Sequence, residues 1–251
     1  MNNNEFRQAP VSEVILGVTF KKKVLQLEDV FTFTQIFKNA YPILELKNPL
    51  ANQKLEAYKH ITEIENDKVG PFRVFQRTRD AKFLIQYQSN KILFNWIRRD
   101  DKDVGEYPGF KSIKEKFDNV LKEYTSTTKD DLLTVDYYDL TYQDRIKWQD
   151  YISNLSDIDQ LFNISLPIMN IDVVNNLVSE LTYKLPELNG YGLLELRTGM
   201  TIDEKQILRF QYTLRGHEDL KNLDHWFEKA HKKQLAIFKD FFKPELLEKW
   251  K

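Results

Sequence analysis

The residues with the clearest chemical potential are amide and guanidinium side chains on predicted strands. An apolar run over residues 92–97 contains Asn95 and Trp96 and is followed by Arg98. Residues 207–215 alternate between apolar and polar side chains, which is typical of a strand with one buried face. Arginine is suited to phosphate or carboxylate, and aromatic side chains beside it could stack on bases. The pattern predicts a polar recognition surface on one sheet face or in one cleft.

The candidate binding residues come from several predicted strands and one predicted helix. They are Gln86, Asn95, Trp96, Arg98, Arg145, Arg209, Gln211, Arg215 and His231. An ordinary structural interpretation stands beside the functional one. Asn95 and Arg98 would then lie on the solvent face or satisfy a loop, and Trp96 would be core. Likewise, His231 would be a core-edge imidazole hydrogen-bonded to the backbone.

Two further charged features have both a functional and a structural interpretation. Arg145 is close in sequence to Asp139 and Asp144, and an ion pair with either would make it a structural residue. The basic residues of the last long helix would form a second binding surface, or simply a solvated helix face. They are Lys229, His231, Lys232, Lys233 and Lys239.

Familiar catalytic and metal-binding motifs are absent from the sequence. There is no Gly-rich phosphate loop, nucleophile elbow, paired-His helix motif or dinucleotide fingerprint. The chain has no Cys and only 4 His, so thiolate chemistry and Cys-based zinc sites are excluded. Residues 100–106 resemble a calcium loop, but the Gly falls one position early and the terminal Glu is missing. We therefore expect no catalytic residues, metal or cofactor.

Composition and charge indicate an ordinary globular protein. The 251 residues carry 37 Lys and Arg against 38 Asp and Glu, so no overall field attracts nucleic acid or anionic lipid. Any such binding must come from a local patch. The first ten residues lack an apolar signal core, and no stretch reaches the roughly 18 apolar residues of a membrane helix. From this we expect a cytoplasmic location and no membrane partner.

Hydrophobic periodicity predicts the same kinds of elements in the two halves of the chain. For the first half it predicts a strand, a helix, four extended segments and a second helix, at residues 14–20, 28–44, 54–64, 72–77, 83–88, 92–98 and 110–124. For the second half it predicts a strand, a short helix, an extended or mixed segment, a hairpin pair and a long helix, at residues 135–146, 156–162, 173–185, 191–198, 207–215 and 219–242.

An internal duplication would explain this order. Residues 35–37 (QIF) match 160–162 (QLF), and 41–44 (YPIL) match 166–169 (LPIM), at one constant offset of half the chain. The predicted fold class is therefore α+β, with two tandem units over residues 1–128 and 129–251 that form one continuous structure. An antiparallel sheet with helices on one face follows, and its topology is similar to TATA-binding-protein-like or helix-grip folds.

Four strings occur in a specific order along the chain. They are PVSEVIL at 10–16, FNWIRR at 94–99 with YP at 107–108, DLTYQDRI at 139–146, and WFEKAH at 226–231 with Trp250 near the end. This order resembles a sporadically distributed bacterial family of uncharacterised proteins of about this length. The sequence departs from the family at Asp139 and Asp144, where the family usually carries Glu and Asn. The resemblance implies no reaction, and patchy distribution implies genes on mobile or defence islands.

These observations lead to a non-enzymatic recognition or adaptor module as the main functional hypothesis. Such a module would bind a protein partner or a charged ligand on its sheet or between its two units. A hydrolase or nuclease with an unfamiliar site is the alternative from another class. Nucleic-acid binding through the sheet face is a third hypothesis, which the near-zero net charge does not favour.

Overall fold

A computed structural model gives the fold, and its strands come from both halves of the chain. It describes residues 9–22, 25–50, 72–99, 107–127, 133–163, 176–200 and 206–251. The first half contributes strands β1 (Val11–Phe20), β2 (Ile43–Lys47), β3 (Arg73–Arg77), β4 (Phe83–Gln88) and β5 (Lys91–Ile97). The second half contributes strands β6 (Val135–Ile146), β7 (Val178–Leu185), β8 (Gly190–Met200) and β9 (Gln206–Gly216).

Helices connect these strands and close the chain. The α-helices are α1 (Leu27–Phe37), α3 (Phe110–Ser126), α4 (Leu223–Phe241) and α5 (Pro244–Lys249). Short 3-10 helices are η3 (Trp148–Asp150), η4 (Leu155–Gln160), η5 (Pro186–Leu188) and η6 (Leu220–Asn222). No helix in the described ranges is both long and apolar enough to span a membrane.

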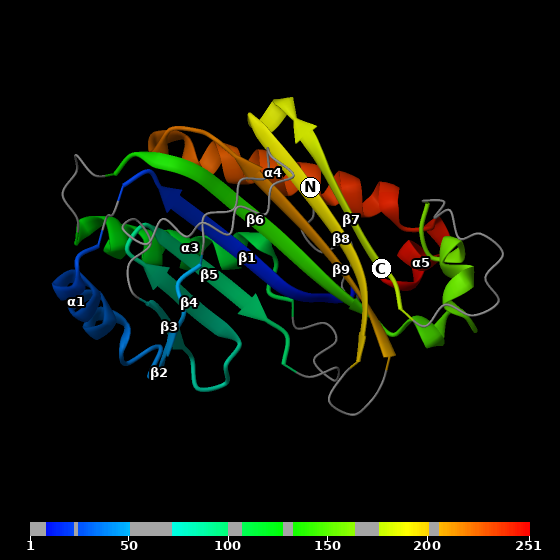
Figure 1. The fold of residues 1–251 in the computed structure, drawn as a ribbon, viewed down its shortest axis with the longest axis horizontal. Helices are drawn as coiled ribbons and strands as arrows, with labels where there is room; N and C mark the ends of the chain where they lie inside the picture. The colour runs from blue at the N-terminus through cyan, green and yellow to red at the C-terminus, as the bar shows by residue number, and fades with distance from the viewer. Residues whose placement is uncertain are drawn as a thin grey trace.

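The nine strands form one antiparallel sheet in the order β2-β3-β4-β5-β1-β6-β9-β8-β7 (Figure 1). The first strands of the two halves, β1 and β6, pair with each other at the centre. In each half the last strand lies next to the central one, and the earlier strands follow toward the edge of the sheet. The order from the centre is β5-β4-β3-β2 on one side and β9-β8-β7 on the other. Strands from the two predicted units, residues 1–128 and 129–251, therefore belong to one continuous sheet.

One face of the sheet is apolar and carries the helices. Helices α3 and α4 lie on the same side of the strands (Figure 1) and touch each other through Phe117 and Phe227, whose ring centroids are 5.5 Å apart. Phe227 in turn packs on Tyr138 of β6, and Phe241 stacks on Phe210 of β9. Helix α1 packs on the same face, because Phe33 contacts Tyr87 of β4 at 4.7 Å. Burial of these rings is the main stabilising contribution to the fold.

The predicted α+β class with an antiparallel sheet is confirmed, but one of the four expected helices is not an α-helix in the structure. Residues 156–162 were expected to form an α-helix, and the structure has the 3-10 helix η4 there. Its two buried residues, Leu155 and Ile158, are three positions apart, a spacing that suits three residues per turn. The expected segment 54–64 lies outside the described residues.

The end of the first predicted helix is also corrected. Helix α1 ends at Phe37, and residues 43–47, which begin in the predicted helical range, form strand β2. Pro42 explains the difference, since a proline disfavours helical conformation at the residue before it and donates no backbone hydrogen bond. The last helix differs less, because the predicted range 219–242 is divided between η6 and α4.

Candidate functional site

The strand register places six of the nine candidate residues on the face opposite the helices. Residues directly opposite each other in neighbouring strands point to the same face of a sheet. One row crosses the sheet from Gln86 through Leu93, Gly17 and Asp139 to Arg215. Other rows on this face contain Asn95, Gln211, Arg145 and Arg209. We call this side of the sheet the polar face.

The polar face has an excess of positive charge. Its cationic side chains are Lys47, Arg73, Arg77, Lys91, Arg145, Lys184, Arg197, Arg209 and Arg215. Its acidic side chains are Glu13, Glu45, Asp139, Glu180 and Glu195. The whole chain has a formal charge of -1. Positive charge is therefore concentrated on one face although the protein as a whole is nearly neutral.

Gln86 and Asn95 belong to a hydrogen-bonded chain across four strands. Arg73 Nη1 donates to Gln86 Oε1 at 2.9 Å, and Gln86 Nε2 donates to Asn95 Oδ1 at 2.8 Å. Asn95 Nδ2 then donates to Glu13 Oε1 at 2.6 Å. Burial raises the pKa of Glu13, although Asn95, Arg145 and Arg209 act in the opposite direction. Because Asn95 is only 1% exposed, it is not the solvent-face residue of the structural interpretation.

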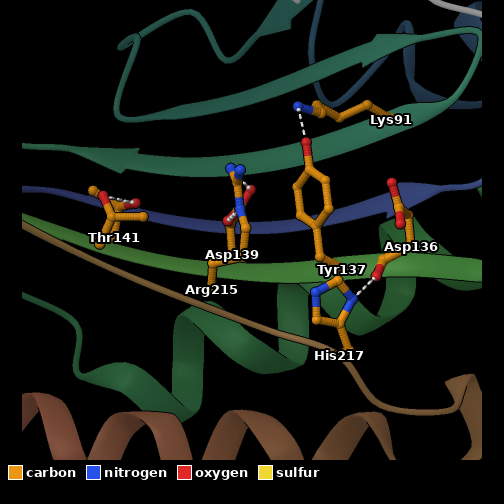
Figure 2. Close-up of polar contacts among 8 residues, drawn as sticks. Lys91, Asp136, Tyr137, Asp139, Thr141, Arg215 and His217 are labelled. Carbon is orange, nitrogen blue, oxygen red and sulfur yellow. Dashed lines mark hydrogen bonds and ion pairs between the residues drawn. The ribbon is translucent and has the colours of Figure 1, made fainter. Parts of the chain in front are cut away.

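Arg215 of β9 lies in a second network, with Asp139 and Tyr137 of β6 and Lys91 of β5 (Figure 2). Its guanidinium donates to both carboxylate oxygens of Asp139, at 2.7 and 3.0 Å. The same group lies 3.8 Å from the ring centroid of Tyr137. On the far side of that ring, Lys91 Nζ donates to Tyr137 Oη at 3.1 Å. Asp139 is therefore the partner of Arg215 and not of Arg145.

Arg145 and Arg209 form an exposed row with a third arginine that the sequence analysis did not single out. Arg209 of β9 lies directly opposite Arg145 of β6 on one side and Arg197 of β8 on the other. All three residues are exposed. We call them the arginine row. Like charges directly opposite each other destabilise a sheet, so this arrangement needs a counter-charge.

Only one member of the arginine row has a carboxylate partner within the described part of the chain. Arg197 Nη2 lies 2.8 Å from Glu195 Oε1 and 3.5 Å from Glu180 Oε2. Neither Arg145 nor Arg209 forms a side-chain hydrogen bond or ion pair with any residue the structure describes. Gln211 is fixed next to the row, since its Nε2 donates to Glu195 Oε2 at 2.8 Å. These two guanidinium groups are the ones available to a ligand.

The other three candidates lie away from the polar face. Trp96 is a core residue that packs on Tyr107 at 5.4 Å, as the structural interpretation proposed. Arg98 Nη2 donates to the carbonyl of Ala9 at 3.0 Å. His231 of α4 is buried and stacks on Phe110 at 4.0 Å. The prediction that Arg98 shares one face with Asn95 and Arg209 is therefore wrong, because alternation along the chain turns it to the helix side.

A buried group that the sequence analysis missed surrounds His231. His231 Nδ1 is 3.2 Å from Tyr142 Oη, which is 3.0 Å from Tyr107 Oη. Asp144 lies two residues after Tyr142 on the same face and influences both tyrosines electrostatically. We call Tyr107, Tyr142, Asp144 and His231 the tyrosine cluster. Its members come from three of the four strings described in the sequence analysis. The strings could be recognised in the sequence, but nothing in them predicts that these residues contact one another.

Burial changes the protonation of the tyrosine cluster. It raises the pKa of Asp144 to about 7, against the opposing effect of the Arg98 charge. It lowers the pKa of His231 to about 4 and raises that of Tyr142 well above its usual range. The Oδ1 atom of Asp144 has no hydrogen-bond partner in the described part of the chain. At neutral pH the cluster therefore holds a neutral imidazole beside a carboxyl group that is close to half ionised.

The basic residues of α4 are spread around the helix. Lys229, Lys232 and Lys239 are exposed, whereas Lys233 pairs with Glu187 at 2.8 Å. Within the described ranges, no group of three or more His, Asp or Glu side chains is arranged to hold a metal ion. No protein-family model matches the chain, and no curated protein matches it.

Proposed function

We propose that the protein is a non-enzymatic recognition module that binds an acidic partner through the arginine row of its polar face. The observation that carries this proposal is the position of Arg145 and Arg209. They are directly opposite on neighbouring strands and exposed, and neither forms a side-chain hydrogen bond or ion pair with a described residue. The one carboxyl group on which both act electrostatically among the described residues is Glu13, a single charge against two. A carboxylate or phosphate placed between them would remove their mutual repulsion and accept hydrogen bonds from both.

The sheet gives this surface a fixed geometry. Neighbouring strands lie about 4.8 Å apart, so the three guanidinium groups start from a baseline of roughly 10 Å across β6, β9 and β8. Strand backbones hold their side chains more precisely than loops do, which favours recognition of a defined pattern of charge. A protein segment with several carboxylates on one side would match this baseline. Nucleic acid would be attracted by the same charge, and the test includes it.

The first prediction concerns binding of an acidic peptide. The double variant R145A/R209A should bind a fluorescein-labelled poly-glutamate peptide at least about tenfold more weakly than the wild type in fluorescence anisotropy. The reason is that a hydrogen bond to a charged group contributes about 1.5–3 kcal/mol to the binding free energy, and about 1.4 kcal/mol changes Kd tenfold. Both side chains are exposed, so the fold should tolerate the change.

A matched control removes the same charge from the other side of the molecule. Lys229 and Lys232 are exposed on α4, and K229A/K232A should keep the wild-type affinity. Loss of binding in this variant alone would assign the site to the basic helix. Stronger binding of a labelled single-stranded oligonucleotide than of the peptide would contradict the proposed partner class.

We also infer that the two halves arose by tandem duplication, as the sequence echo predicts. In support, each half places its first strand at the centre, its last strand beside it and the earlier strands outward. In each half the last strand is also followed by an amphipathic α-helix, α3 or α4, on the same face. The family resemblance and a role on a mobile or defence island stay proposals of the same kind, as does a cytoplasmic location.

A further inference from the structure

Three buried residues with unused hydrogen-bond donors meet on the polar face, away from the arginine row. Thr19 of β1 lies directly opposite Lys91 of β5 on one side and Tyr137 of β6 on the other. Lys91 reaches over this position, and its Nζ lies 3.1 Å from Tyr137 Oη (Figure 2). The exposed fractions of Thr19, Lys91 and Tyr137 are 1%, 5% and 4%.

The side chains of Thr19, Lys91 and Tyr137 have more hydrogen-bond donors than they have acceptors to bind. A lysine ammonium has three donors, and Lys91 spends one of them on Tyr137 Oη. Because Tyr137 Oη accepts that bond, its own hydrogen is left to donate. The Oγ1 atom of Thr19 is buried and has no hydrogen-bond partner among the residues that the structure describes. The hydroxyl groups of Thr19 and Tyr137 can therefore still donate hydrogen bonds, and both lie beside the positive charge of Lys91.

No carboxylate compensates Lys91 within the described part of the chain. Its contacts there are the hydroxyl and the ring of Tyr137, whose centroid is 5.3 Å from Nζ. Asp139, an acidic residue of the same network, is engaged in the bidentate pair with Arg215. A buried charge without a counter-charge is costly, and native proteins pair such groups with an anion or another ligand.

We infer that Thr19, Lys91 and Tyr137 form a binding position for one oxyanion group, a phosphate or a carboxylate. Its oxygens would accept hydrogen bonds from the ammonium and from both hydroxyl groups. Arg215 is a positioning residue here, because its guanidinium stacks on the Tyr137 ring and fixes the direction of the hydroxyl. The position is separate from the arginine row, since Arg145 follows Tyr137 by eight residues on β6, about 26 Å along an extended strand.

The test is thermal unfolding with inorganic phosphate, acetate or chloride at matched pH and ionic strength. Wild-type protein should show a saturable increase in Tm with phosphate or with acetate relative to chloride, and the stronger of the two identifies the oxyanion class. When Lys91→Met is added to R145A/R209A, the anion-dependent increase should disappear. Tm of Lys91→Met in chloride should be no lower than in the wild type, because an uncompensated buried charge has been removed.

Milder variants keep the test decisive if the lysine variant does not fold. Thr19→Val and Tyr137→Phe each remove one hydroxyl and should weaken the anion dependence about tenfold in apparent Kd. R145A/R209A separates the two sites, because it removes any increase in Tm that the anion produces at the arginine row and should keep the increase that comes from Thr19, Lys91 and Tyr137. An absent increase in the wild type, or an unchanged increase in Lys91→Met, Thr19→Val and Tyr137→Phe, would overturn the inference.

Discussion

Replacement of Asp139 by alanine should lower the free energy of unfolding by about 3–5 kcal/mol, because it breaks a buried ion pair from one side. Asp139 and Arg215 are both buried and form a bidentate contact. Burial alone would lower the pKa of Arg215, but the Asp139 charge raises it above its ordinary value. Without the carboxylate, the guanidinium loses its counter-charge in a poorly solvated place. Urea unfolding of D139A measures this effect.

A double variant distinguishes the ion pair from simple packing. D139L/R215M removes both charges and leaves apolar side chains of similar size, so it should recover most of the lost stability. The Thr141 and Thr213 pair, in the row next to Asp139 and Arg215, provides a local comparison, because T141V breaks a hydrogen bond between two hydroxyls and should cost only about 1 kcal/mol. A loss of stability in D139L/R215M as large as in D139A would show that the charges do not depend on each other.

The second large effect concerns Asp144 and pH. Its pKa is about 7 in the folded protein against an ordinary value of 3.8. The folded state therefore binds more protons than the unfolded state between these values, and stability from this group falls as pH rises from about 4 to about 7. At 1.36 kcal/mol for each pKa unit, Asp144→Asn should be more stable than the wild type by about 4 kcal/mol at pH 8 and equal to it near pH 4.

His231 has the opposite dependence. Its pKa is lowered from 6.5 to about 4 by burial, so its contribution to stability is complete above pH 6.5 and is lost as pH falls toward 4. The two slopes oppose each other between about pH 4 and 6.5. Free energies from urea unfolding across this range should therefore rise with pH in Asp144→Asn and fall with pH in His231→Gln, relative to the wild type. Parallel curves for the three proteins would contradict both pKa values.

Side-chain alternation was sufficient to assign faces within a strand. The pattern of residues 207–215 correctly separated Leu208 and Phe210 from Arg209 and Gln211. Trp96 was a candidate binding residue, and the structure places it in the core, as the alternative structural interpretation held. Alternation does not predict which residue of a neighbouring strand lies opposite a given side chain, because that depends on strand order and register. Arg197 became a candidate only when β8 was seen to place it opposite Arg209.

The two buried groups were harder to predict for the same reason. Thr19, Lys91 and Tyr137 lie on β1, β5 and β6, and these strands are neighbours only because the chain returns to its centre twice. The contact of Tyr142 with His231 joins a strand to a helix 89 residues later. Local sequence patterns contain no information about such distances. Pro42 was different, since its effect on the helix end is local and could have been used to predict β2.

The central position of β1 has a consequence for how the chain is made. Val11 at its start lies opposite Asp144, so this first strand cannot complete its pairing until β6 has been synthesised. At roughly 5–20 residues per second, the ribosome needs on the order of ten seconds to add the intervening segment. Strand β5 can cover one edge of β1 earlier, but the other edge of this apolar strand stays unpaired until β6 is made, and an unpaired apolar edge favours aggregation. We therefore expect refolding to be slow, because the central pairing joins strands far apart in the sequence.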